Sequence, residues 1–151
     1  MTASPADDLL FLLYDVARIM RVRTDQHARL TGMTRAQWVL LVWLERQPGL
    51  SQNELAALVE VEPITVARLI DRLEARGVVE RRLDPRDRRV RRLHLTAQAA
   101  PLLMIIHAYR NDLDTLLASG IKSEDAKRVI AALLKMKSNL LEEKRDSAEA
   151  G

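Results

Sequence analysis

The segment from residue 51 to residue 95 constrains the fold of this chain most strongly, because its start and stop signals mark two short helices in quick succession. Ser51, followed three residues later by Glu54, predicts the capped start of a helix of about eight residues. Pro63 is suited to the first position of the next helix, and Gly77 is suited to end it. The spacing therefore predicts a helix-turn-helix.

A basic hairpin is expected directly after these helices. Two runs of strand-forming residues, 78–83 and 90–95, flank a loop at 84–89. Positions 81–92 hold seven arginines and two aspartates, a net charge of +5, whereas the whole chain carries +3. Such a concentration of positive charge beside a helix-turn-helix is suited to the phosphates and grooves of double-stranded DNA.

Two helices are predicted before this segment. Ser4 as N-cap and Pro5 at the first helical position predict the start of a long helix, which Gly32 would end. Thr34, with Gln37 three residues on, predicts a capping box at the start of the next helix.

Two more helices are predicted after the hairpin. Thr96 would begin a helix that runs through Ala118, with Pro101 shifting its true start by a few residues or adding a mild kink. Ser123 would cap a last helix, whose end we expect to fray from Glu142 onward. The fold class expected from these elements is mainly α with a small β-hairpin wing.

The composition agrees with a single helical domain and excludes several functions. At 151 residues and 48% apolar content the chain can bury one core, and an aromatic content of 3% argues against a β-sandwich. The absence of cysteine excludes disulfides and thiolate metal sites. The polar, acidic N-terminus does not resemble a signal peptide, and no apolar run could span a bilayer, so we expect a cytoplasmic protein without a membrane partner.

The second helix of the predicted helix-turn-helix would turn one face toward DNA. Thr65 and Arg68 lie opposite its apolar stripe and are the best candidates for reading base edges, because arginine pairs with guanine. Arg72, Ser51 and Gln52 would contact phosphate or, alternatively, have no role beyond capping.

The arginines of the hairpin are expected to have different roles. Arg86 and Arg88 at the loop tip are candidates for a minor groove. Arg89 could instead pair with Asp87 or Asp71 and hold the hairpin, a structural role at least as plausible on the sequence. Arg81 and Arg82 are expected on a solvated strand edge.

Other classes of function have less support. The three histidines, His27, His94 and His107, share no metal-ligand spacing, and the chain contains no H-E-x-x-H, phosphate-binding glycine loop or nucleophile elbow, so we expect neither an enzyme nor a metal or cofactor site. The alternative is a helical protein–protein interaction module, but such a module would not need a basic hairpin.

The helix-to-hairpin block resembles the MarR family of bacterial winged-helix transcription regulators. The resemblance is carried by residues 73–81 (LEARGVVER), 84–89 (DPRDRR) and 95–96 (LT), and residues 33–38 (MTRAQW) resemble the SlyA-like branch. It implies one domain over residues 1–151, with a winged-helix lobe at 34–96.

The resemblance also implies partners. Helices within 4–32 and 97–142 would assemble an obligate homodimer, and this dimer would read a pseudo-palindromic operator as a repressor or an anti-silencer. A small anionic or aromatic effector, such as an aromatic carboxylate, would bind in a crevice near the residues Arg18, Arg21, Trp38, Val42 and Arg68 and would loosen DNA. Family members that sense oxidants use a cysteine, which this chain lacks.

Overall fold

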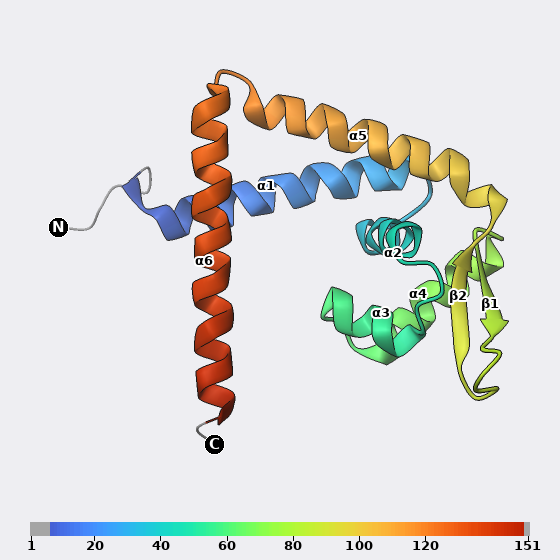
Figure 1. The fold of residues 1–151 in the computed structure, drawn as a ribbon. Helices are drawn as coiled ribbons and strands as arrows, with labels where there is room; N and C mark the ends of the chain where they lie inside the picture. The colour runs from blue at the N-terminus through green and yellow to red at the C-terminus, as the bar shows by residue number, and fades with distance from the viewer. Residues whose placement is uncertain (1–6, 150–151) are drawn as a thin grey trace. The chain divides into compact units, whose positions relative to one another are not determined.

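The computed structural model describes the backbone of residues 7–149 and the side chains of residues 7–143 (Figure 1). In this part the chain forms six α-helices, a short 3-10 turn after the hairpin and a two-stranded antiparallel hairpin. The expected fold class, mainly helical with a small hairpin, is therefore confirmed. The chain divides into two compact units, Met1–Tyr109 and Arg110–Gly151. None of the helices in the described range is both long and apolar enough to cross a membrane.

Helix α1 (Leu9–Leu30) begins later than the sequence suggested. Ser4 and Pro5 lie outside the described residues, and the N-cap of the observed helix is Asp8, whose carboxylate accepts a hydrogen bond from the Phe11 backbone N–H at 3.1 Å. The far end was predicted correctly, because Gly32 has the left-handed φ of 68° that ends helices without strain.

Helices α2 (Arg35–Arg46) and α3 (Gln52–Val59) both start with the predicted capping boxes. The hydroxyl of Thr34 accepts from the backbone N–H of Gln37 at 3.2 Å, and the Gln37 side chain accepts from the Thr34 N–H at 2.9 Å. Ser51 and Glu54 repeat this arrangement at 3.1 and 2.8 Å. Helix α4 (Pro63–Ala75) starts at the predicted proline.

The core of the first unit lies around α2. The helix contributes Leu40, Leu41 and Leu44, all at most 2% exposed. Against them pack α3, the apolar stripe of α4 and residues of the hairpin, namely Leu55, Val66, Ile70, Leu73, Val79 and Leu93. The buried stripe of α4 leaves the opposite face of that helix free for other contacts.

The turn between α3 and α4 contains a left-handed residue that is not glycine. Glu60, the C-cap of α3, has φ 53° and ψ 44°, and the next backbone N–H, of Val61, donates to Ala56 O at 3.1 Å. A side chain in this conformation is strained, and a carboxylate is unfavourable at the negative end of a helix.

We therefore expect Glu60→Gly to raise the free energy of unfolding by roughly 0.5–1 kcal/mol, because glycine adopts this conformation without strain. Urea unfolding would measure the change. Glu60→Ala is the matched control, since it removes the charge but keeps the Cβ, and it should gain less. An equal gain from both variants would mean that the charge, and not the backbone, is responsible.

The hairpin is formed by β1 (Val79–Leu83) and β2 (Arg91–Leu95), each starting one residue later than predicted. Val79 pairs with Leu95 at its base and Leu83 with Arg91 near its tip. The link before α3 joins the hairpin, since the backbone N–H of Gly49 donates to Leu93 O and that of Leu93 donates to Leu50 O, both at 2.9 Å. The hairpin is thereby fixed to the helix-turn-helix.

The helices after the hairpin differ from the prediction at their ends. Thr96 caps a short 3-10 turn, η2 (Ala97–Ala99), and α5 (Ala100–Ala118) begins only there, which is the shift that Pro101 was expected to cause. In α6 (Ser123–Glu149), Ser123 is the first helical residue and not the cap, and the helix continues past Glu142. Up to Tyr109, α5 lies along α1 (Figure 1), and the hydroxyls of Tyr109 and Thr24 are 3.0 Å apart.

Candidate nucleic-acid interface

Helix α4 presents three polar side chains on the face opposite its buried stripe. Thr65, Arg68 and Arg72 are all exposed, whereas Val66, Ile70 and Leu73 are completely buried. In the described part of the chain the two arginines form no hydrogen bond or ion pair. Their guanidinium groups are therefore available to an external acceptor.

Arg81 on β1 is not the solvated strand-edge residue that the sequence suggested. Its guanidinium donates to the amide oxygen of Gln52 at 3.0 and 2.8 Å and also bonds the carboxylates of Asp71, at 2.5 Å, and Glu74. Only 18% of its side chain is exposed. The expectation was wrong because residues of α3 and α4, distant in sequence, surround this arginine. Arg81 joins the hairpin to both helices.

This cluster also changes the interpretation of the α3 cap. The amide oxygen of Gln52, a candidate phosphate contact, accepts hydrogen bonds from Arg81. The hydroxyl of Ser51 accepts from the Glu54 backbone N–H. The structure thus gives both side chains an internal role, which agrees with the alternative that they do no more than cap and hold the helix.

Arg92 on β2 is the centre of a second ionic cluster, which the sequence did not reveal. Its guanidinium donates to Asp84 at 2.7 Å and to Glu54 at 2.8 Å. The carboxylate of Asp84 is 8% exposed and also accepts from the backbone N–H groups of Arg86, at 2.7 Å, and Asp87, at 3.2 Å. The bond from Arg92, followed by these backbone bonds, holds the pKa of Asp84 below its ordinary value.

The lowered pKa of Asp84 leads to a pH prediction. A carboxylate with a depressed pKa stabilises the fold fully above its ordinary value, 3.8, and this stabilisation is lost as the pH falls through the lowered value. The difference in free energy of unfolding between the wild type and Asp84→Asn should therefore shrink as the pH falls below 3.8. Urea unfolding of both proteins at pH 6 and at about pH 3 would measure it. A difference that does not depend on pH would contradict this role of Asp84.

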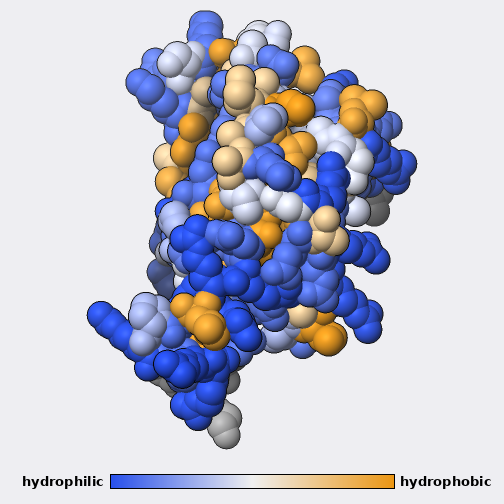
Figure 2. All heavy atoms as spheres, turned by 90° about the vertical axis from the view of Figure 1, so that its right-hand side faces the viewer, coloured by the Kyte–Doolittle hydropathy of each residue, from blue (hydrophilic) through white to orange (hydrophobic). Residues whose placement is uncertain are grey.

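The tip of the hairpin keeps its positive charge available. Arg89 pairs with Asp87, at 3.1 and 3.2 Å, which decides between the two partners that the sequence left open. Arg86 and Arg88 are exposed, and their side chains have no partner among residues 7–143, whose side chains the structure describes. Arg91, which was not singled out from the sequence, has the same properties. Figure 2 views the molecule from the side on which Figure 1 draws the hairpin, and hydrophilic residues cover most of the lower half of that face.

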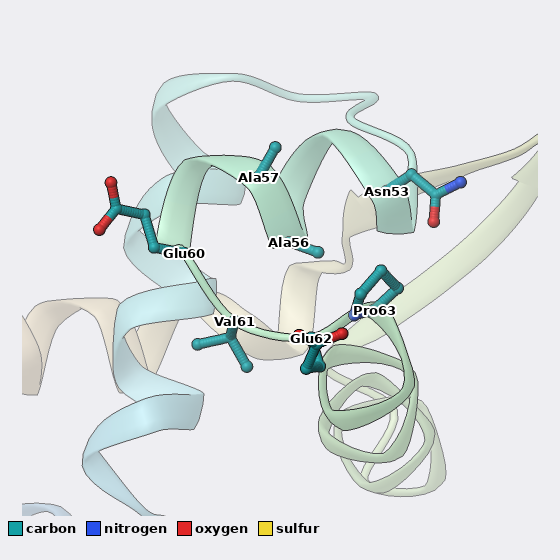
Figure 3. A pocket seen from close by; sticks show the side chains of 7 residues that line it. All are labelled: Asn53, Ala56, Ala57, Glu60, Val61, Glu62 and Pro63. Atoms are coloured by element: carbon teal, nitrogen blue, oxygen red, sulfur yellow. The ribbon is translucent and has the colours of Figure 1, made fainter. Parts of the chain in front are cut away.

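The turn before α4 borders a shallow hollow (Figure 3). Its lining comes from the end of α3 and the start of α4 and consists of Asn53, Ala56, Ala57, Glu60, Val61, Glu62 and Pro63. The two glutamates give this hollow a negative charge, and no basic residue lines it. It is therefore unsuited to a phosphate, although it adjoins a helix N-terminus.

The candidate effector residues do not form one open site. Trp38 is 3% exposed, and its indole N–H donates to the Thr31 hydroxyl at 3.1 Å. Val42 is half-buried against the same core. Arg18 and Arg21 are exposed on α1, and Arg18 is paired with Asp15 at 2.6 Å. No free planar face of Trp38 is therefore offered to an aromatic ligand.

The arrangement of α3, α4 and the hairpin matches known proteins. The MarR family model matches residues 31–90. A crystal structure of the transcriptional regulator SlyA is similar with a TM-score of 0.79 and 25% identity, over 90% of this chain and 96% of that one. A complex of Staphylococcus aureus MepR with DNA is similar with a TM-score of 0.78 and 25% identity, over 91% of this chain and 99% of that one. A crystal structure of MarR is similar with a TM-score of 0.73 and 28% identity, over 88% of this chain and 97% of that one.

The three structural matches extend over about nine tenths of the chain, whereas the family model covers residues 31–90. The proteins of this family are transcription regulators and not enzymes, in agreement with the sequence-based expectation. Residues 31–90 of this chain match the MarR family, and its fold is that of the MarR-type winged-helix transcription regulators.

Proposed function

We propose that this protein is a sequence-specific DNA-binding regulator that acts as a homodimer on a pseudo-palindromic operator, where it represses transcription or relieves silencing. The observation that carries the proposal is the distribution of arginine partners. The clusters around Arg81 and Arg92 hold the hairpin against the helices, whereas Arg68, Arg72, Arg86, Arg88 and Arg91 are exposed and, in the described chain, unpaired.

The division of roles on DNA follows from the positions of these residues. Thr65 and Arg68 lie on the exposed face of α4, which fits a major groove, and we assign base reading to them. Arg86 and Arg88 at the hairpin tip would enter the adjacent minor groove, and Arg72 and Arg91 would contact phosphates. The winged-helix lobe that contacts DNA would comprise residues 34–96. The similar MepR structure is a complex with DNA, which supports DNA as the partner of this fold.

A homodimer is supported by the apolar residues that α1 and α6 leave exposed. Phe11, Val16 and Ile19 on α1 are 43–50% exposed, and Ile130, Leu134 and Leu140 on α6 are 58–69% exposed. Such apolar stripes are typical of surfaces that a second chain covers. Two-fold symmetry would then place two equivalent α4 helices on half-sites about one helical turn apart.

Selection of bound duplexes from a random DNA library tests the proposal. We expect a palindromic consensus with half-sites about 10 base pairs apart. Sedimentation at micromolar protein concentration should show a dimer. Recovery of no preferred sequence would overturn sequence-specific binding and would favour the alternative, a helical protein–protein interaction module.

We also propose that a small aromatic carboxylate modulates DNA binding. Arg18 and Arg21 are exposed on α1 and could bind its carboxylate through charge-assisted hydrogen bonds. Because Trp38 is buried, the ligand would act on the indole by changing the packing between α1 and α2. It alters DNA affinity only if it binds the DNA-competent and incompetent states unequally.

A salicylate titration in the Trp43→Phe background tests the effector proposal, because Trp38 is then the one tryptophan. We expect the Trp38 fluorescence to change and the operator affinity to fall in parallel, by about 5- to 150-fold at saturation. Arg18→Ala/Arg21→Ala should abolish both responses. Unchanged fluorescence and unchanged affinity would eliminate this class of ligand.

A further inference from the structure

An arginine at the end of α4 reaches across to the end of α1. Arg76, the C-cap residue of α4, donates from Nη1 to the backbone oxygen of Gly32 at 2.9 Å and from Nη2 to that of Thr31 at 3.0 Å. Thr31 is itself the C-cap residue of α1. One guanidinium therefore bridges the ends of two helices that are more than 40 residues apart in the sequence.

The end of α1 offers Arg76 a suitable acceptor. The backbone N–H groups of Gly32 and Met33 already satisfy the carbonyls of Arg29 and Ala28, at 2.9 and 3.1 Å. The carbonyls that follow, of Thr31 and Gly32, receive their hydrogen bonds from Arg76. A positive charge at this position also complements the negative end of the helix dipole. Arg76 thus completes the C-terminal cap of α1 from another helix.

The same turn is the place where α1, α2 and α4 meet. The indole N–H of Trp38, on α2, donates to the Thr31 hydroxyl at 3.1 Å. The charged side chains of α4 before its end either bond within the lobe, as Asp71 and Glu74 do with Arg81, or have no partner. Over residues 7–143, Arg76 therefore makes the only side-chain hydrogen bonds from the α4 segment to the end of α1.

We propose that Arg76 is a positioning residue that fixes the recognition helix α4 relative to α1 and so sets the operator half-site spacing that the dimer accepts. The inference rests on the proposed function, because α1 would belong to the dimerisation region and α4 would read DNA. One bidentate pair of hydrogen bonds from a guanidinium restricts the direction of α4 more than apolar contacts alone do. Without these bonds the winged-helix lobe can rotate relative to α1, and the two α4 helices of the dimer lose their fixed separation.

Binding to duplexes of different spacing tests this role. The probes are the duplex recovered by selection from random DNA and versions with one or two base pairs added or removed at its centre. Each base pair moves a half-site by about 3.4 Å and rotates it by about 34°, so the wild type should discriminate against the altered spacings by at least about tenfold. We expect Arg76→Ala and Arg76→Gln to reduce this preference to about threefold or less, and Arg76→Lys to be intermediate.

Arg29→Ala is the matched control. Arg29 is exposed in the last turn of α1, and its side chain has no partner among the described residues. The Arg29→Ala variant should discriminate between duplexes of different half-site spacing as strongly as the wild type does. If Arg76→Ala weakened binding to every spacing by the same factor, or changed nothing, the positioning role would be overturned.

A second measurement does not need DNA. Because the chain has no cysteine, Ala57→Cys on the exposed side of α3 gives one spin label per protomer. Double electron–electron resonance should show a narrow distance distribution between the two labels, which Arg76→Ala broadens and Arg29→Ala leaves unchanged. An unbroadened distribution for Arg76→Ala would overturn this inference alone. Absence of a dipolar signal in the labelled wild type, or of any selected duplex, would instead overturn the proposed function and this inference with it.

Discussion

The variant Ile130→Asp/Leu134→Asp is expected to be a monomer that no longer binds an operator tightly. The two side chains lie one turn apart on α6 and are 58% and 62% exposed in a single chain. In the proposed dimer they would be buried, and an unpaired buried carboxylate costs several kcal/mol, so two of them should raise the dimer dissociation constant by on the order of 10³ or more. Sedimentation equilibrium would measure this shift.

The matched control places the same charges on the other side of α6. Ala132 and Asn139 are exposed and lie roughly opposite the apolar stripe at 3.6 residues per turn, so Ala132→Asp/Asn139→Asp should remain a dimer. Operator affinity should follow the oligomeric state, because a monomer engages only one half-site. A dimer of normal strength in Ile130→Asp/Leu134→Asp would show that α6 does not form the interface.

The sequence predicted those features of the fold that depend on neighbouring residues. The capping boxes of α2 and α3 link residues three apart, and the glycine after α1 ends that helix by its own backbone preference. The pairing of Arg89 with Asp87, two positions away, was one of the two alternatives that the sequence left open, and the structure decided between them. The capping interactions, by contrast, can be inferred from spacing alone.

The roles of the individual arginines could not be predicted in the same way. Arg81 bonds Gln52, 29 residues away, and Arg92 bonds Glu54, 38 residues away, so both depend on how the hairpin packs against α3. The sequence shows seven arginines within twelve positions but not which of them are neutralised. Arg91 was overlooked because it shares a strand face with the buried Leu93. Near the tip, however, the hairpin extends beyond the core, and Leu83, opposite Arg91, is 52% exposed.

The burial of Trp38 shows a different limit. Residues 39–42 and Leu44 of its helix are all apolar, which is typical of a core helix, but the resemblance to a ligand-responsive family favoured a binding surface. The hydrogen bond from its indole N–H to Thr31 and its edge-on contact with Tyr109, at 5.7 Å between ring centres, favour the structural role. A residue's likeness to a family's ligand site thus does not establish that its side chain is accessible.

Arg68→Ala and Arg88→Ala are expected to weaken DNA binding in two distinguishable ways. Loss of a bidentate contact to guanine should cost Arg68→Ala about 1–3 kcal/mol on the selected operator, with little loss on unrelated DNA. Its sequence preference should therefore relax at one base position in each half-site. Arg88→Ala should weaken binding to most sequences, because a residue at the exposed tip of the hairpin contributes mainly through charge.

The salt dependence of binding separates these two contributions. Each positive charge that neutralises the DNA backbone and is removed should reduce the magnitude of the negative slope of log K against log salt concentration by about 0.9 per site. This magnitude should therefore fall for Arg88→Ala and stay close to the wild-type value for Arg68→Ala. Arg46→Ala is the matched control, since Arg46 is exposed at the end of α2, outside the candidate interface, and has no partner within the described residues. If both variants lowered specific and non-specific binding by the same factor, the assignment of base reading to α4 and of charge-driven binding to the hairpin would be wrong. If the two effects separate, the exposed face of α4 carries the sequence specificity, and the hairpin adds affinity that falls as the salt concentration rises.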